Sequence, residues 1–131
     1  MKVISATQFN SKLKCTVQAT GKLGFSEVAC KELELGVGSK FIKFGREGNQ
    51  LYLGVVETND DGSAFALHQA GVYYYLLTKV MFESLGYDFK RKSYIFDLVR
   101  DVTRDADFGG AAYRMSERTR DRRNANAEGK K

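Results

Sequence analysis

The sequence contains no proline, no tryptophan, one histidine and two cysteines. Without proline, its turns have to be set by glycine, asparagine and aspartate. No apolar run approaches the roughly 20 residues that a membrane-spanning helix needs. The first residues, MKVISATQF, lack the long apolar core of a signal peptide. We therefore expect a cytoplasmic protein with no membrane partner.

The shortage of histidine and cysteine argues against catalysis and metal binding. His68 lies on a predicted strand, and no Cys or His pair has the spacing of zinc ligands. Neither Gly-x-x-x-x-Gly-Lys nor Gly-x-Gly-x-x-Gly, the phosphate-binding motifs, occurs. We predict no catalytic residue, no metal, no cofactor and no enzymatic activity. Cys15 and Cys30 are expected to be buried thiols, with a disulfide between them as the alternative.

Positive charge is unevenly distributed. The net charge is +5, yet residues 114–131 contain seven Lys and Arg against three Asp and Glu, so the remainder is almost neutral. From Asp105 onward the apolar pattern fades, and we predict a linker and a mobile basic tail over residues 105–131. Such a tail could bind an anionic polymer through Arg118, Arg120, Arg122 and Arg123.

A length of 131 residues suits one domain, which we place at residues 1–104. Alternation of apolar and polar residues over 12–19 predicts a half-buried strand, and residues 1–9 are expected to form an earlier one. Gly54 interrupts another predicted strand and indicates a bulge. These patterns predict an α+β fold: a mostly antiparallel, curved sheet or small barrel of about seven or eight strands with two short helices.

Two segments of the chain have a similar order of predicted elements. Residues 21–44 predict a strand, a short helix capped by Ser26, a glycine turn and a second strand. A strand–helix–strand order returns later with Thr78 at the cap position. Pseudo-repeats over about residues 12–58 and 64–102 would allow a pseudo-twofold arrangement within one chain. The alternative is that both segments merely share the physics of helix capping.

Three consecutive tyrosines mark a further predicted strand. Tyr73 and Tyr75 would share one face, while Tyr74 would point the other way. Exposed tyrosines beside lysines can stack on unpaired bases. The alternative is that these rings pack against a helix or a partner subunit.

Two short segments carry a family resemblance. The residues GKL at Gly21–Leu23 and GSK at Gly38–Lys40 are followed by a predicted hairpin, KFIKFGREGNQLYLGVV. Residues 21–56 thereby resemble the AbrB/SpoVT-type swapped-hairpin family of DNA-binding proteins. The resemblance implies a hairpin-based DNA-binding fold, with DNA contacts at Lys22 and Lys31.

The resemblance covers about a quarter of the chain, and the sequence departs from the family's pattern at two positions. Ser26 replaces the proline that usually begins the helix, and Cys30 stands where a second arginine is common.

Two functions follow from these patterns. The first is non-enzymatic binding of nucleic acid, with DNA favoured over RNA, through the basic tail and a lysine strip. The strip consists of Lys22, Lys31, Lys40 and Lys43. The alternative is a structural or assembly subunit that makes protein contacts through sheet edges and tyrosines. Formation of a homo-oligomer is compatible with either function.

Overall fold

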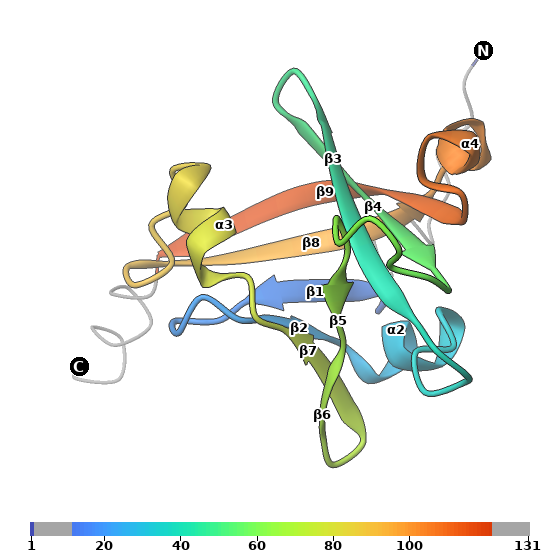
Figure 1. Cartoon of the computed structure of the whole chain (residues 1–131). Coiled ribbons are helices and arrows are strands. Elements are labelled where there is room, and N and C mark those ends of the chain that lie inside the picture. Colours follow the sequence, from blue (N-terminus) through green and yellow to red (C-terminus); the bar gives the residue numbers. More distant parts are fainter. Residues whose placement is uncertain (2–11, 122–131) are drawn as a thin grey trace.

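The computed structural model describes Met1 and residues 12–121 (Figure 1). The strand expected over residues 1–9 therefore lies, apart from Met1, outside the described residues, as do Arg122 and Arg123.

Within the residues that the structure describes, nine strands form a single sheet. They are β1 (Lys14–Val17), β2 (Leu23–Phe25), β3 (Phe41–Glu47), β4 (Gln50–Val56), β5 (Phe65–Ala66), β6 (His68–Ala70), β7 (Tyr73–Leu76), β8 (Lys92–Arg100) and β9 (Ala111–Asp121). The helical elements described are α2 (Glu27–Glu32), α3 (Lys79–Ser84), the 3₁₀ helix η1 (Val102–Arg104) and α4 (Asp105–Phe108).

The strands follow the order β5-β3-β4-β9-β8-β1-β2-β7-β6, and each of these neighbouring pairs is antiparallel. The two strands at the ends of this order, β5 and β6, are separated along the chain by Leu67 alone. The sheet is therefore a nearly closed barrel, with a few short helices around it (Figure 1). The predicted α+β class and the mostly antiparallel sheet are confirmed, and the described residues alone contain nine strands where about seven or eight were predicted.

Two parts of the chain share an order of strands and helices, apart from β5, η1 and α4. The hairpin β1–β2, helix α2 and hairpin β3–β4 are followed by the hairpin β6–β7, helix α3 and hairpin β8–β9. Corresponding strands also meet, because β2 pairs with β7 and β4 pairs with β9. Figure 1 shows α2 and α3 at opposite ends of the barrel.

The prediction of a linker and tail from Asp105 is wrong over residues 105–121. This segment forms α4 and then β9, which lies between β4 and β8 in the middle of the sheet. The first half of β9 contributes Tyr113 and Met115 to the core. The second half pairs with β8 as far as Asp121, although it is rich in charge. The second half of β9 contains few apolar residues, so its arginine-rich sequence has the pattern of a solvated tail.

The bulge predicted at Gly54 is also wrong, because β3 and β4 pair without interruption from Phe41↔Val56 to Glu47↔Gln50. Gly54 serves a different purpose. A Cβ atom at this position would overlap the ring of Phe108, and a Cβ atom at Gly45 would lie 3.0 Å from the far end of the same ring. The two glycines on adjacent strands leave space for Phe108, and this contact fastens α4 to the barrel.

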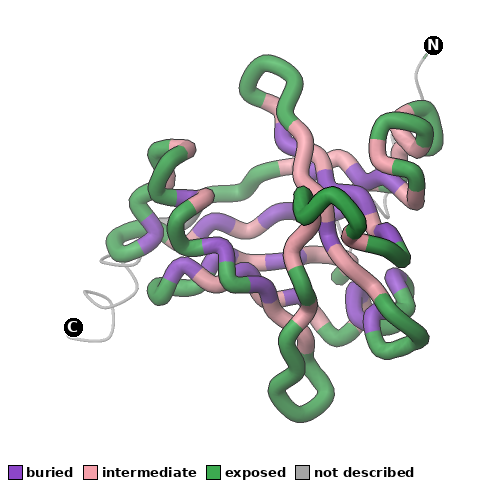
Figure 2. The backbone as a smooth tube through the Cα atoms, in the orientation of Figure 1, coloured by how far each residue is buried: buried purple, intermediate pink, exposed green. Residues whose placement is uncertain are grey.

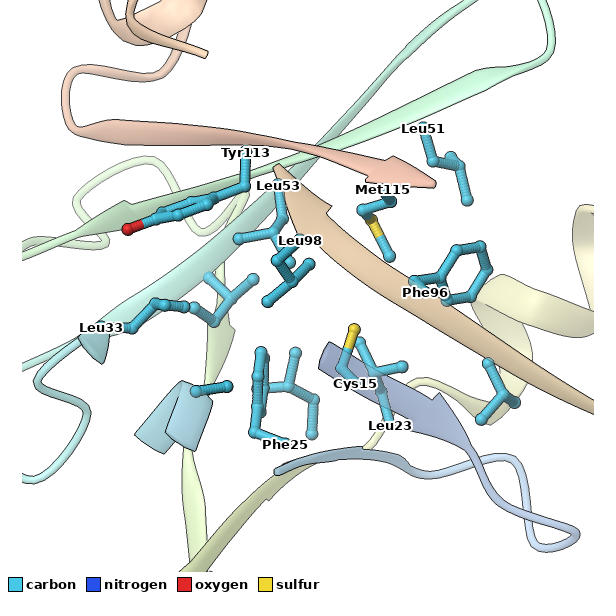
Figure 3. Close-up of a cluster of buried hydrophobic side chains, with 14 of the residues drawn as sticks. Cys15, Leu23, Phe25, Leu33, Leu51, Leu53, Phe96, Leu98, Tyr113 and Met115 are labelled. Atoms are coloured by element: carbon cyan, nitrogen blue, oxygen red, sulfur yellow. The ribbon is translucent and has the colours of Figure 1, made fainter. Parts of the chain in front are cut away.

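The core fills the interior of the barrel. Strand β8 alternates strictly, with Tyr94, Phe96 and Leu98 buried and the residues between them partly exposed. Figure 3 shows Phe96 and Leu98 turned toward side chains from other strands, including Cys15 of β1. Figure 2 shows that the tips of the β3–β4 and β6–β7 hairpins extend outward as exposed segments. Alternation of this kind is what separates a buried face from a solvated one on each strand.

The two predicted helix caps behave differently. Ser26 is the N-cap of α2, and its hydroxyl accepts from the Ala29 amide at 3.1 Å and donates to the Lys12 carbonyl at 2.6 Å. Thr78 precedes α3 but makes no side-chain cap bond. Its buried hydroxyl donates instead to the Gly21 carbonyl at 2.9 Å. Thr78 therefore joins the two halves of the molecule rather than capping its own helix.

Candidate nucleic-acid interface

A groove crosses the outer face of β1, β2 and β7, beside the end of β6. We call it the tyrosine groove. Its lining residues are Lys14, Thr16, Gln18, Lys22, Gly24, Phe25, Ser26, Ala70, Tyr73, Tyr74 and Tyr75. The first half of the chain supplies its lysines and an amide, and the second half supplies its tyrosines. The pairing of β2 with β7 brings the lysines and the tyrosines together.

Tyr75 lies between two cationic or ionisable side chains. The Lys22 ammonium is 4.9 Å from the centre of the Tyr75 ring. On the other neighbouring strand, the His68 ring stacks on Tyr75 with centroids 5.4 Å apart and planes 23° apart. The cation–π contact holds Lys22 over the groove instead of letting it extend into solvent. Lys22, Tyr75 and His68 therefore form one ordered cluster.

Tyr73 has the most exposed ring of the three tyrosines. It lies on the same face of β7 as Tyr75 and is 50% exposed. Tyr74 points the other way, as the alternation of the strand predicts, and packs against the core cluster. Its hydroxyl lies 2.7 Å from where a Cβ atom of Gly36 would be. Tyr73 therefore provides the accessible aromatic face, and Tyr74 anchors the strand.

Gly24 lies beneath the middle of the groove. A Cβ atom there would lie 2.7 Å from Nε2 of Gln18, so the Gln18 amide extends across the glycine. An amide in this position can donate to and accept from the edge of a base. Lys14 and Gln18 were not among the predicted site residues. The signal was present in the sequence, because both lie on the polar face of an alternating strand.

Arg118 reaches the same side of the sheet from β9. Its guanidinium binds the Asp97 carboxylate in a bidentate manner, with Nε–Oδ2 at 2.8 Å and Nη2–Oδ1 at 3.1 Å. Backbone pairing connects Arg118 to the groove through Ile95 and Thr16. The structure thus places Lys22, Tyr73 and Tyr75 in one groove and Arg118 on the same outer surface of the barrel, four strands away from β7. Arg120 continues β9 and pairs with Ser93 through the backbone.

The four lysines predicted as a strip do not line one groove. Lys31 lies on α2 and pairs with Glu27 at 3.4 Å. Lys40 and Lys43 pair with Glu57 at 3.8 Å and Asp61 at 4.0 Å. These two lysines line a different hollow, which α4 and the end of α2 border and which also contains Glu32, Glu34 and Glu57. Acidic neighbours make that hollow a poor place for a polyanion, whereas Lys22 faces an aromatic ring.

The cysteines are buried and free, as the sequence predicted. Burial raises the pKa of the Cys15 thiol, and the nearby Asp97 carboxylate adds to the increase. Burial also raises the pKa of Cys30. Both groups are therefore neutral thiols at pH 7.

Among the residues that the structure describes, no group of three or more His, Cys, Asp and Glu side chains is placed to hold a metal ion. Over the same residues, none of the helices has the length and apolar character required to cross a bilayer.

Comparisons with protein-family models, with curated proteins and with solved structures return no match for this chain.

Proposed function

We propose that the protein is a non-enzymatic nucleic-acid-binding protein and that the tyrosine groove is its binding site. The observation that carries this proposal is the cluster of Lys22, Tyr75 and His68 beside the half-exposed ring of Tyr73. Lysines attract the phosphate backbone, and an exposed ring stacks on a base. The Gln18 amide across Gly24 adds a hydrogen-bonding group between them.

The charge of the whole chain supports the same function. The net charge is +5, which favours approach of a polyanion. The resemblance of residues 21–56 to AbrB/SpoVT-type proteins favours DNA over RNA. The alternative function, protein assembly through sheet edges, gains less support, because β5 and β6, at the ends of the strand order, are only two and three residues long.

The proposal predicts that Tyr73→Ala and Lys22→Ala weaken binding in different ways. The measurement is fluorescence anisotropy with a labelled thymidine strand about a dozen nucleotides long. Loss of the stacking ring in Tyr73→Ala should cost about 1–3 kcal/mol, or roughly 5- to 150-fold in affinity. Lys22→Ala should weaken binding less at moderate salt and reduce the salt slope of log K by roughly 0.7, the value for one phosphate contact.

Lys90→Ala is the matched control for charge, because Lys90 is an exposed lysine of the loop between α3 and β8 and does not line the groove. Equal losses in Lys22→Ala and Lys90→Ala would show that only net charge matters and would contradict the proposed site. A loss in Lys31→Ala as large as that in Lys22→Ala would move the site toward α2. Absence of binding by the full chain at about 50 mM salt would overturn the proposed function.

A further inference from the structure

The tyrosine groove is one end of a longer surface. Six strands, β6-β7-β2-β1-β8-β9, are consecutive neighbours in the sheet. One row of directly paired residues crosses all six of them: His68, Tyr75, Gly24, Thr16, Ile95 and Arg118. At about 4.8 Å between neighbouring strands, this row is roughly 24 Å long when measured along the curved sheet. The row therefore connects the tyrosines to Arg118 across the outer surface of the barrel.

The chemistry changes along this row. Aromatic rings lie at the β6–β7 end, and a guanidinium lies at the β9 end. Gly24 and Thr16 in the middle present little bulk of their own, and the Gln18 amide extends across Gly24. Paired residues on a sheet point to the same face, and the residues flanking this row on β1 and β8, including Cys15 and Phe96, are buried in the core. The whole row accordingly faces outward.

We propose that this row is a track for single-stranded nucleic acid, which crosses the strands from Tyr73 to Arg118. The inference rests on the proposed function and specifies its ligand. An exposed tyrosine can stack on a base only where that base is unpaired and unstacked, since a duplex covers both faces of each base pair. The exposed ring and the Arg118 guanidinium lie far apart on a curved surface, and a flexible single strand can contact both more easily than a stiff duplex can.

Asp97 controls how strongly Arg118, at the β9 end of this track, can bind a phosphate. Its side chain is only 15% exposed and holds Arg118 through both oxygens. A phosphate that approaches Arg118 meets this carboxylate and must compete with it. Asp97 is therefore a positioning residue that fixes the guanidinium against β8 and reduces its net attraction for phosphate.

The test compares the full chain with two variants, using labelled single- and double-stranded thymidine–adenosine oligonucleotides of equal length. The wild type should bind the single strand more tightly than the duplex. Asp97→Asn should tighten single-strand binding severalfold and steepen the salt slope by roughly 0.7, because Arg118 is then available to one more phosphate. The double variant Asp97→Asn/Arg118→Gln should lose that gain. The double variant keeps the wild-type net charge and leaves no largely buried carboxylate without its partner.

Glu57→Gln is the matched control, since it also removes one carboxylate from an ion pair but lies at the separate hollow beside Lys40. An equal gain in Glu57→Gln, or a double variant as tight as Asp97→Asn, would overturn the extension to Arg118. A wild type that binds duplex as tightly as the single strand would overturn the track while leaving the proposed function intact. Failure to bind either oligonucleotide would contradict both.

Discussion

The contact between Phe108 and Gly54 shows how much can depend on one hydrogen atom. The ring of Phe108 lies over Gly54 and Gly45, and a methyl group on Gly54 would occupy the place of the ring. Because β4 is paired on both sides, with β3 and β9, its backbone has little freedom to move away. The side chain that has to move is therefore Phe108, and α4 would move with it.

Gly54→Ala should consequently destabilise the protein by about 1–3 kcal/mol, the usual cost of overpacking. Urea denaturation followed by circular dichroism measures this cost. A double-mutant cycle with Phe108→Ala provides the control, since the cost of Gly54→Ala should largely disappear once the ring is absent. If the cost is unchanged in the Phe108→Ala background, the ring is not its cause.

At the scale of elements, α4 is held by one carboxylate as well as by this ring. Asp105 binds the Arg100 guanidinium of β8, with Oδ2 at 2.8 Å from Nη2, and also accepts from the Ala112 amide of β9 at 2.9 Å. The hydrogen bond from Arg100 lowers the pKa of Asp105, and the bond from the Ala112 amide lowers it further. One charged group thus links the short helix to the two central strands.

A lowered pKa means that the ionised carboxylate is favoured in the folded state. Its stabilising contribution is therefore present above the pKa of the unfolded chain, about 3.9, and is lost as the pH falls through the lower folded value. Wild type should be more stable than Asp105→Asn at pH 7, and the difference should vanish in acid. Thermal unfolding from neutral to acidic pH measures it.

Asp107→Asn is the appropriate comparison, because Asp107 lies on the same helix and makes a longer ion pair, 3.6 Å from Arg104. Because this ion pair is longer than the one between Asp105 and Arg100, Asp107→Asn should destabilise the protein less at pH 7 than Asp105→Asn does. A stability difference between wild type and Asp105→Asn that persists unchanged at low pH would argue against the linkage.

At the scale of the whole molecule, β9 joins parts of the sheet that are distant in sequence. It pairs with β4 on one side and β8 on the other. A chain ending at Gly110 would lose both ladders and should lack the cooperative thermal transition of the full chain. A chain ending at Asp121 retains every described strand and serves as the control. A cooperative transition in the shorter chain would show that β9 is dispensable.

The sequence predicted the parts of this fold in which local pattern and tertiary position agree. The alternation of β1 and the cap at Ser26 are read directly from neighbouring residues. Strand β9 was missed because its second half is charged and gains its order from pairing with β8, which a local pattern does not report. The sequence predicted Thr78 as a helix cap, but its hydroxyl donates to the carbonyl of Gly21, which is far away in sequence.

The candidate site shows the same division. Lys22, Tyr73 and Tyr75 could be selected from the sequence because lysine and tyrosine are residue types that bind phosphates and stack on bases. Their combination with Arg118 could not be predicted, because it depends on the order β7-β2-β1-β8-β9. Lys40 and Lys43 were grouped with Lys22 by charge alone, and the barrel directs them to a different hollow.

The central position of β9 has a consequence for synthesis. Of the described strands, β9 is synthesised last. Its two partners, β4 and β8, are synthesised before it, and β4 is separated from it by more than 50 residues. Until β9 arrives, β4 and β8 each carry an unpaired edge, the feature through which incomplete chains associate wrongly. The nascent chain therefore passes through an interval in which most of its apolar residues are already translated but the barrel cannot close. Protection during that interval has to come from chaperones or from rapid completion of translation.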